Sequence, residues 1–124
     1  MDELEKLRKH WQDDDFQRKH ALAREIVVNR LRELNREYEE KTGQGFVRFI
    51  ETRMKTPESI AEKLQRKDYD VDFDTAVTAL NDISGVRCIC YSVKEIYWIA
   101  RQIGKTDTYT VVKAKDYIRK PKKN

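Results

Sequence analysis

The strongest constraint on the fold is a change of pattern after a long helical start. The first 42 residues carry apolar residues at helical spacing, and the three aspartates at 13–15 offer a break and an N-cap inside them. Six shorter segments follow, in the order strand, helix, helix, strand, helix, strand. They cover residues 46–55, 57–66, 73–80, 85–91, 93–103 and 109–115. This order predicts an α/β (α+β) fold in which helices flank a mixed sheet.

Local signals mark where the helices begin and end. Gly43 is a candidate left-handed cap for the first long helix, and Gly104 closes the last one. Thr56 followed by Pro57 is typical of an N-cap and a first helical position. We expect residues 1–45 to form a helical arm and residues 46–124 to form an α/β domain. Three strands are few for such a domain, so we expect its sheet to be incomplete in this chain.

The charge balance permits an anionic partner. Lys and Arg number 26 against 22 Asp and Glu, so the net charge is +4 and the isoelectric point lies near 9.0. A mildly basic chain can bind a nucleotide or an RNA, but the balance alone selects neither. Tyr117 is the one aromatic residue near the C-terminal lysines, so base stacking on single-stranded RNA has little support.

Two cysteines, Cys88 and Cys90, form a C-x-C pair on the second predicted strand. They are too few for a zinc site, and we interpret them as small buried hydrophobic residues. The sequence shows no secretory leader and no apolar run of spanning length. We therefore expect a reducing, cytoplasmic location and no membrane partner.

The corner between the first strand and the next helix, ETRMKTPESIAEKL at 51–64, gathers cations. Arg53 and Lys55 share one face of the strand, and Ser59 and Lys63 share one face of the helix. The helix also offers free backbone N–H groups at its N-terminus, so the corner can bind phosphates. There is no glycine-rich Walker loop.

The alternative for this corner is an ordinary strand end. In that interpretation Arg53 and Lys55 are solvated, and Glu58 or Glu62 neutralises the lysines.

A second group of polar residues is NDISGVRCIC at 81–90. A carboxylate at a strand end, such as Asp82, commonly holds Mg²⁺ against a phosphate, and the guanidinium of Arg87 can stack on a base. The turn at Ser84–Gly85 must change the strand parity if both are to face one site. Alternatively, Asp82 caps the turn and Arg87 pairs with a surface acid.

The third group is the basic C-terminal stretch KAKDYIRKPKKN at 113–124, which is either a phosphate-binding loop or a solvated tail. Together the three groups resemble the (p)ppGpp synthetase domain of RelA/SpoT-type alarmone synthetases, most of all the small stand-alone synthetases. The resemblance is carried by R-x-K-x-x-x-S-x-x-x-K from Arg53, D-I-x-G-x-R from Asp82 and K-D-Y-I-x-x-P-K-x-N from Lys115.

The resemblance implies a GTP pyrophosphokinase of the stringent response, with a nucleotidyltransferase-like fold. Such an enzyme transfers pyrophosphate from ATP to the 3′-hydroxyl of GDP or GTP, with Mg²⁺ as cofactor. The implied roles are adenine stacking by Arg53 and Arg87; ATP phosphate binding by Lys55, Ser59 and Lys63; catalysis and metal binding by Asp82; and guanosine nucleotide binding by Lys115, Lys122 and Asn124.

The family pattern continues into G-Y-x-S-x-H, with a guanine-stacking tyrosine, and E-x-Q-x-R-T, with a catalytic glutamate, and this sequence contains neither. We therefore expect an N-terminal portion of a synthetase domain, with little activity on its own. An unpaired sheet edge would favour a homo-oligomer. Two alternatives remain: a non-catalytic nucleotide-binding or regulatory module, and a basic RNA-binding protein.

Overall fold

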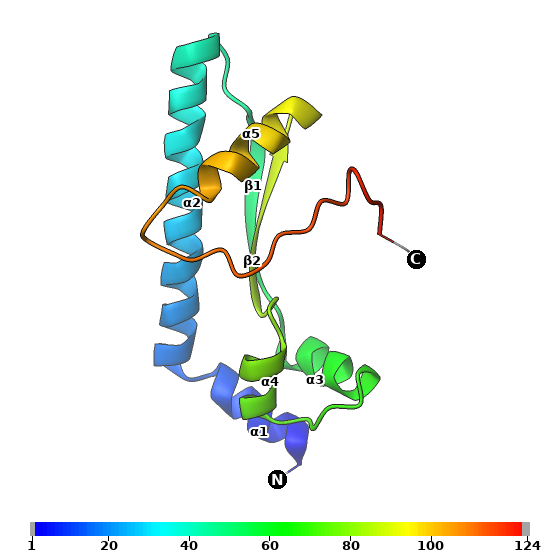
Figure 1. Ribbon diagram of the computed structural model, residues 1–124. Helices are drawn as coiled ribbons and strands as arrows, with labels where there is room; N and C mark the ends of the chain where they lie inside the picture. Colours follow the sequence, from blue (N-terminus) through cyan, green and yellow to red (C-terminus); the bar gives the residue numbers. More distant parts are fainter. Residues whose placement is uncertain (1, 123–124) are drawn as a thin grey trace.

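The computed structural model describes residues 2–122 and contains five helices and two strands in that range. The helices are α1 (Glu3–Trp11), α2 (Asp14–Thr42), α3 (Pro57–Arg66), α4 (Phe73–Ala79) and α5 (Val93–Ile103). The strands are β1 (Val47–Met54) and β2 (Ser84–Cys90). Figure 1 shows α2 running beside the two-stranded ribbon, with α1, α3 and α4 gathered at one end of it.

The N-terminal helical segment divides into α1 and α2 at the three aspartates, as predicted. The Asp13 side chain accepts a hydrogen bond from the backbone N–H of Phe16 over 2.9 Å, which caps α2. Gly43 ends α2 with φ 85°, a left-handed conformation that glycine adopts without steric cost. Both predicted ends of this helix are confirmed.

The two strands pair antiparallel, with Glu51 opposite Arg87 and Arg53 opposite Gly85. One face of the sheet packs against α2 and α5 through residues such as Ile50 and Val86. The other face carries Glu51, Arg53 and Arg87, which are exposed. The sheet therefore has one covered apolar face and one open polar face, as antiparallel sheets commonly do.

Two apolar clusters hold the chain together, one at each end of the ribbon. The first joins residues of α1, α3 and α4 to the start of β2: Leu7, Trp11, Ile60, Ala61, Leu64, Ala76, Leu80 and Ile83. The second joins α2, the sheet and α5 around Leu31, Leu34, Phe46 and Ile99. Because α1 and α2 each contribute to a cluster, the helical arm packs directly on the elements that follow it.

The prediction of a third strand at 109–115 is wrong for this chain. The segment is irregular, and its residues from Thr110 onward are exposed, with Val112 at 93%. A strand forms only when a neighbouring strand pairs with it and its apolar face is covered. Neither condition holds here, so the described sheet has two strands and the expectation of an incomplete sheet is met. Within residues 2–122, no helix is both long and apolar enough to cross a membrane.

Candidate functional site

Two lysines of the β1–α3 corner converge on one carboxylate. The Nζ atom of Lys63 donates a hydrogen bond to Oδ2 of Asp82 over 2.7 Å, and Nζ of Lys55 lies 3.0 Å from the same oxygen. The side chains of Lys55 and Lys63 are only 20% and 19% exposed, whereas that of Asp82 is 46% exposed. The structure thus brings together three of the predicted site residues, from the residue after β1, from α3 and from the turn before β2.

The charges of this cluster set the protonation of Asp82. Partial burial raises the pKa of the Asp82 carboxyl, but hydrogen bonds from Lys63 and Lys55 and the charges of both ammonium groups outweigh it. The pKa falls from 3.8 to about 2. Asp82 is therefore a carboxylate at neutral pH, as a metal ligand must be.

Backbone contacts explain how Lys55 reaches this place. Its N–H donates to the carbonyl of Ile83 over 2.8 Å, which extends the pairing of β1 and β2 by one residue. Its own carbonyl accepts a hydrogen bond from the indole Nε1 of Trp11 over 2.8 Å. Lys55 thus sits between a residue next to Asp82 and a residue of α1.

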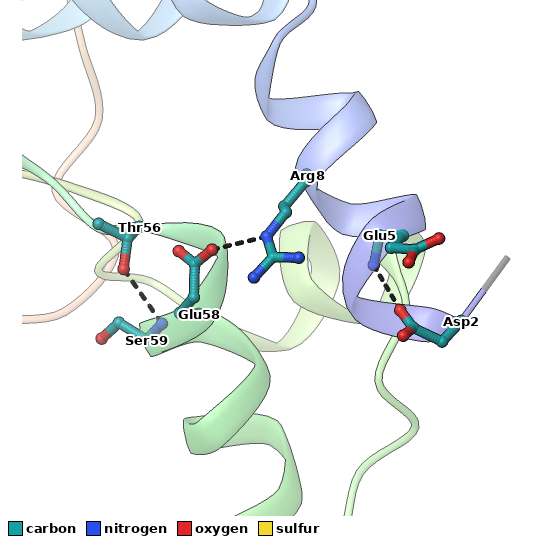
Figure 2. A network of polar contacts seen from close by, with 6 residues as sticks. All are labelled: Asp2, Glu5, Arg8, Thr56, Glu58 and Ser59. Atoms are coloured by element: carbon teal, nitrogen blue, oxygen red, sulfur yellow. Dashed lines mark hydrogen bonds and ion pairs between the residues drawn. The ribbon is translucent and has the colours of Figure 1, made fainter.

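The first turn of α3 begins two residues after Lys55, at Pro57. Thr56 caps it, because its Oγ1 accepts a hydrogen bond from the backbone N–H of Ser59 over 3.1 Å. Glu58 pairs with Arg8 of α1 over 2.8 Å. Figure 2 shows Glu58 turned toward Arg8, while the half-buried Ser59 points its side chain away from α1.

In the alternative interpretation of the corner Glu58 or Glu62 pairs with the lysines, but these contacts show a different pairing, while Arg53 is exposed as that interpretation expects. Glu58 forms its ion pair with Arg8, and both lysines form theirs with Asp82. Since Arg8 neutralises Glu58, this acidic side chain is occupied away from the lysines. The helix N-terminus and two cations therefore remain grouped around a single carboxylate.

Arg53 and Arg87 lie on the same open face of the sheet. Arg53 is opposite Gly85, and Arg87, two residues later on β2, is opposite Glu51, two residues earlier on β1. A Cβ atom at Gly85 would meet nothing within 4 Å, so the space beside Arg53 is open. Arg87 also pairs with the surface acid Glu51, at 3.2 Å between Nη1 and Oε1, as the alternative interpretation expected.

The change of strand parity falls one residue earlier than predicted. The backbone bends at Ile83, and Ser84 and Gly85 already belong to β2. The buried side chain of Ile83 enters the cluster beneath α3 and α4, which turns the chain before the strand begins. Asp82 therefore lies outside the strand, and strand alternation with Arg87 does not apply to it.

The described residues of the basic C-terminal stretch are exposed. Lys115 is exposed and lines a hollow of about 590 Å³ together with Asn81, Val111, Val112 and Lys113. Asn81, on the same hollow, is the residue before Asp82. Lys122 is exposed, and no ion pair joins Lys115 or Lys122 to the other site residues within 2–122. Asn124 lies outside the described residues.

Asp82 fits Mg²⁺ as a single protein ligand. Residues 2–122 contain no group of three or more His, Cys, Asp or Glu side chains arranged to hold a metal ion. Mg²⁺ in phosphoryl-transfer sites commonly uses one or two carboxylates, with water and substrate phosphates supplying the remaining oxygens. The half-exposed Asp82 carboxylate, next to two lysine ammonium groups, suits that arrangement.

Sequence reasoning missed two supporting contacts. The indole N–H of Trp11, a residue without a predicted role, donates to the Lys55 carbonyl over 2.8 Å. Arg24 of α2 donates to the hydroxyl of Ser84 over 2.6 Å, at the start of β2. Neither contact has a local sequence signal, because each joins residues more than forty positions apart.

The comparisons with known proteins show the family of this α/β chain. The family description "Region found in RelA / SpoT proteins" matches residues 52–124. The chain therefore belongs to the RelA/SpoT family. It is 30% identical over 124 residues to GTP pyrophosphokinase YwaC of Bacillus subtilis (strain 168). That alignment covers all of this chain but 58% of YwaC, so the chain spans little more than half of this relative.

Solved structures show the same relationship. Small alarmone synthetase 1 from Bacillus subtilis, bound to its product pppGpp, superposes with a TM-score of 0.72 at 26% identity, over 89% of this chain and 57% of that one. The same synthetase bound to AMPCPP gives a TM-score of 0.69 at 28% identity, over 86% and 57%. The predicted nucleotidyltransferase-like α/β class of this family is confirmed, within the part of it that this chain spans.

Proposed function

We propose that this chain supplies the donor half of a (p)ppGpp synthetase site, where ATP binds before its pyrophosphate passes to the 3′-hydroxyl of GDP or GTP. The observation that carries the proposal is the convergence of Lys55 and Lys63 on Asp82, next to the N-terminus of α3. The similar small alarmone synthetase 1 from Bacillus subtilis has been solved with bound pppGpp and with bound AMPCPP, which supports nucleotide substrates.

In this proposal the lysines and the α3 N-terminus bind the ATP phosphates. Two cations and a helix N-terminus attract a triphosphate, and the half-buried Ser59 in the first turn can donate its hydroxyl. Arg53 and Arg87 hold the adenine on the open face of the sheet, where Gly85 leaves room for a planar ring. Base and phosphates then lie on adjoining surfaces.

Pyrophosphate transfer requires mainly that the reacting groups are positioned and that the phosphate charge is neutralised. Lys55 and Lys63 offset the negative charge of the transferred group, and their low exposure limits competition from water. Asp82 would hold Mg²⁺, which when bound neutralises phosphate charge and orients the oxygens. Lys115 and Lys122, and Asn124 beyond the described residues, are proposed for the guanosine nucleotide.

Two further properties belong to this proposal. The described sheet has only two strands, so each strand has an unpaired edge that favours self-association into a homo-oligomer. Sedimentation velocity at increasing protein concentration tests this, and a constant monomer would refute it. The cytoplasm, which supplies ATP and guanosine nucleotides and keeps Cys88 and Cys90 reduced, is the proposed location.

Calorimetric titration of AMPCPP with Mg²⁺ tests the donor site. The parent chain is expected to bind, and Lys63→Ala is expected to weaken binding by about tenfold or more, because a charge-assisted contact is lost. Lys67→Ala is the matched control, since Lys67 is an exposed lysine that caps the C-terminus of the same helix. Equal losses in both variants would point to general charge attraction and contradict a built site.

A further inference from the structure

We propose that Trp11 is a positioning residue of the donor site and acts through the backbone of Lys55. The inference rests on the proposed function, because it concerns the same phosphate-binding lysine. The Trp11 side chain is 7% exposed. Its one polar atom, the indole Nε1, donates to the Lys55 carbonyl over 2.8 Å, across 44 positions of sequence.

This contact completes the fixing of the Lys55 backbone. On its other side, the Lys55 N–H donates to the carbonyl of Ile83 over 2.8 Å. The two peptide groups that flank the Lys55 Cα atom are therefore both held, one by Ile83 just before β2 and one by Trp11 of α1. A side chain that starts from a fixed backbone loses less freedom when it binds a ligand, so the Lys55 ammonium is preorganised beside Asp82.

Trp11 is itself held in place from two other elements. Its carbonyl accepts a hydrogen bond from the Gln17 side-chain amide of α2 over 2.6 Å. Its ring lies 5.0 Å from that of Phe16 and 6.3 Å, edge-on, from that of Phe73 at the start of α4. The direction of the indole N–H is thus determined by α2 and α4 as well as by α1.

Packing alone does not account for an indole here. The cluster around Trp11 is apolar, and a phenylalanine would fill much of the same volume. A buried indole N–H needs an acceptor, and the acceptor is the carbonyl between a site lysine and the N-cap residue Thr56. The N–H therefore links the α1 helix to the corner where phosphates are proposed to bind.

The test replaces Trp11 by the isosteric amino acid β-(3-benzothienyl)alanine, which keeps the ring shape and lacks the N–H, and in parallel by Trp11→Phe. AMPCPP with Mg²⁺ is titrated by calorimetry into each variant, with and without Lys55→Ala. We expect each Trp11 change to weaken binding by about three- to tenfold in the parent background. With Lys55→Ala present, the same change should alter binding by less than about twofold.

Leu7→Val is the control, because Leu7 is fully buried in the same cluster and its apolar side chain has no hydrogen-bond donor that could hold the Lys55 carbonyl. It should lower thermal stability and leave AMPCPP affinity unchanged. Equal weakening by the isostere with and without Lys55→Ala would overturn the positioning role, and so would no weakening at all. A parent chain that binds no AMPCPP, or that binds it equally well as Lys55→Ala and Lys63→Ala, would overturn the proposed function itself.

Discussion

Lys63 donates a hydrogen bond to Asp82 over 2.7 Å, and the accepting oxygen is the one that Lys55 also approaches to 3.0 Å. One carboxylate thereby satisfies two cations of the proposed phosphate site. A triphosphate must compete with this carboxylate for both ammonium groups, while a divalent cation would compete with the lysines for Asp82. When nucleotide and metal bind together, we therefore expect both lysines to leave Asp82 for the phosphates and Asp82 to bind the metal instead.

Asp82→Asn tests this exchange. Removing the negative charge frees Lys55 and Lys63, so the affinity for tripolyphosphate without metal should rise by about three- to tenfold. Calorimetry at about 0.15 M salt measures it, so that distant charges are screened. Asp70→Asn, at an exposed position between α3 and α4, makes the same change of net charge and should raise affinity much less. Equal gains in the two variants would contradict the exchange.

The low pKa of Asp82 predicts a pH dependence of stability. Its folded-state pKa of about 2 lies below the ordinary value of 3.8, so the ionised form is favoured in the folded chain. This contribution is present above about pH 4 and is lost as the pH falls toward 2. The stability difference between the parent and Asp82→Asn, from urea unfolding, should shrink over that interval. A carbon-13 titration of the Asp82 carboxyl with a midpoint near 4 would refute the prediction.

The cap of α3 should contribute measurably to stability. Thr56→Ala removes the hydroxyl that accepts the Ser59 N–H, which should lower the free energy of unfolding by about 1 kcal/mol. Thr56→Ser keeps the acceptor and should retain most of that stability. Urea unfolding of the three proteins measures both changes. Similar losses for alanine and serine would mean that the hydroxyl does not cap the helix.

The helical arm should unfold together with the rest of the chain. Leu7 of α1 is fully buried against residues of α3 and α4, so Leu7→Ala should lower the unfolding free energy by about 2–5 kcal/mol. Leu22→Ala removes the same atoms from an exposed position on α2 and should have a much smaller effect. A small loss for Leu7→Ala would indicate that α1 is an independent appendage.

The sequence predicted the elements whose signals are local. Asp13, Gly43 and Thr56 are caps, and caps depend on side chains within three or four residues of the helix end. The corner residues Lys55 and Lys63 were predicted together because strand and helix spacing each fix one of them. The family resemblance implied that Asp82 belongs to the same site as these lysines, but their pairing with its carboxylate, across nineteen positions from Lys63, was not predicted.

Other features depended on contacts that no local pattern encodes. The segment at 109–115 has strand character, but pairing needs a neighbour and an apolar surface, and the described chain provides neither at that place. The hydrogen bond from Trp11 to Lys55 and the ion pair from Arg8 to Glu58 join α1 to residues 44 and 50 positions away. Tertiary packing alone brings these residues together.

The most direct test of the donor site is the titration of ATP with Mg²⁺ into the parent chain, Arg53→Ala and Arg48→Ala. Arg48 is an exposed arginine on the same strand and serves as the matched control. We predict that the parent and Arg48→Ala bind alike, while Arg53→Ala binds at least about tenfold more weakly, because the base loses a stacking partner. Equal affinity of all three proteins, or no binding by the folded parent, would contradict a donor nucleotide site at the β1–α3 corner.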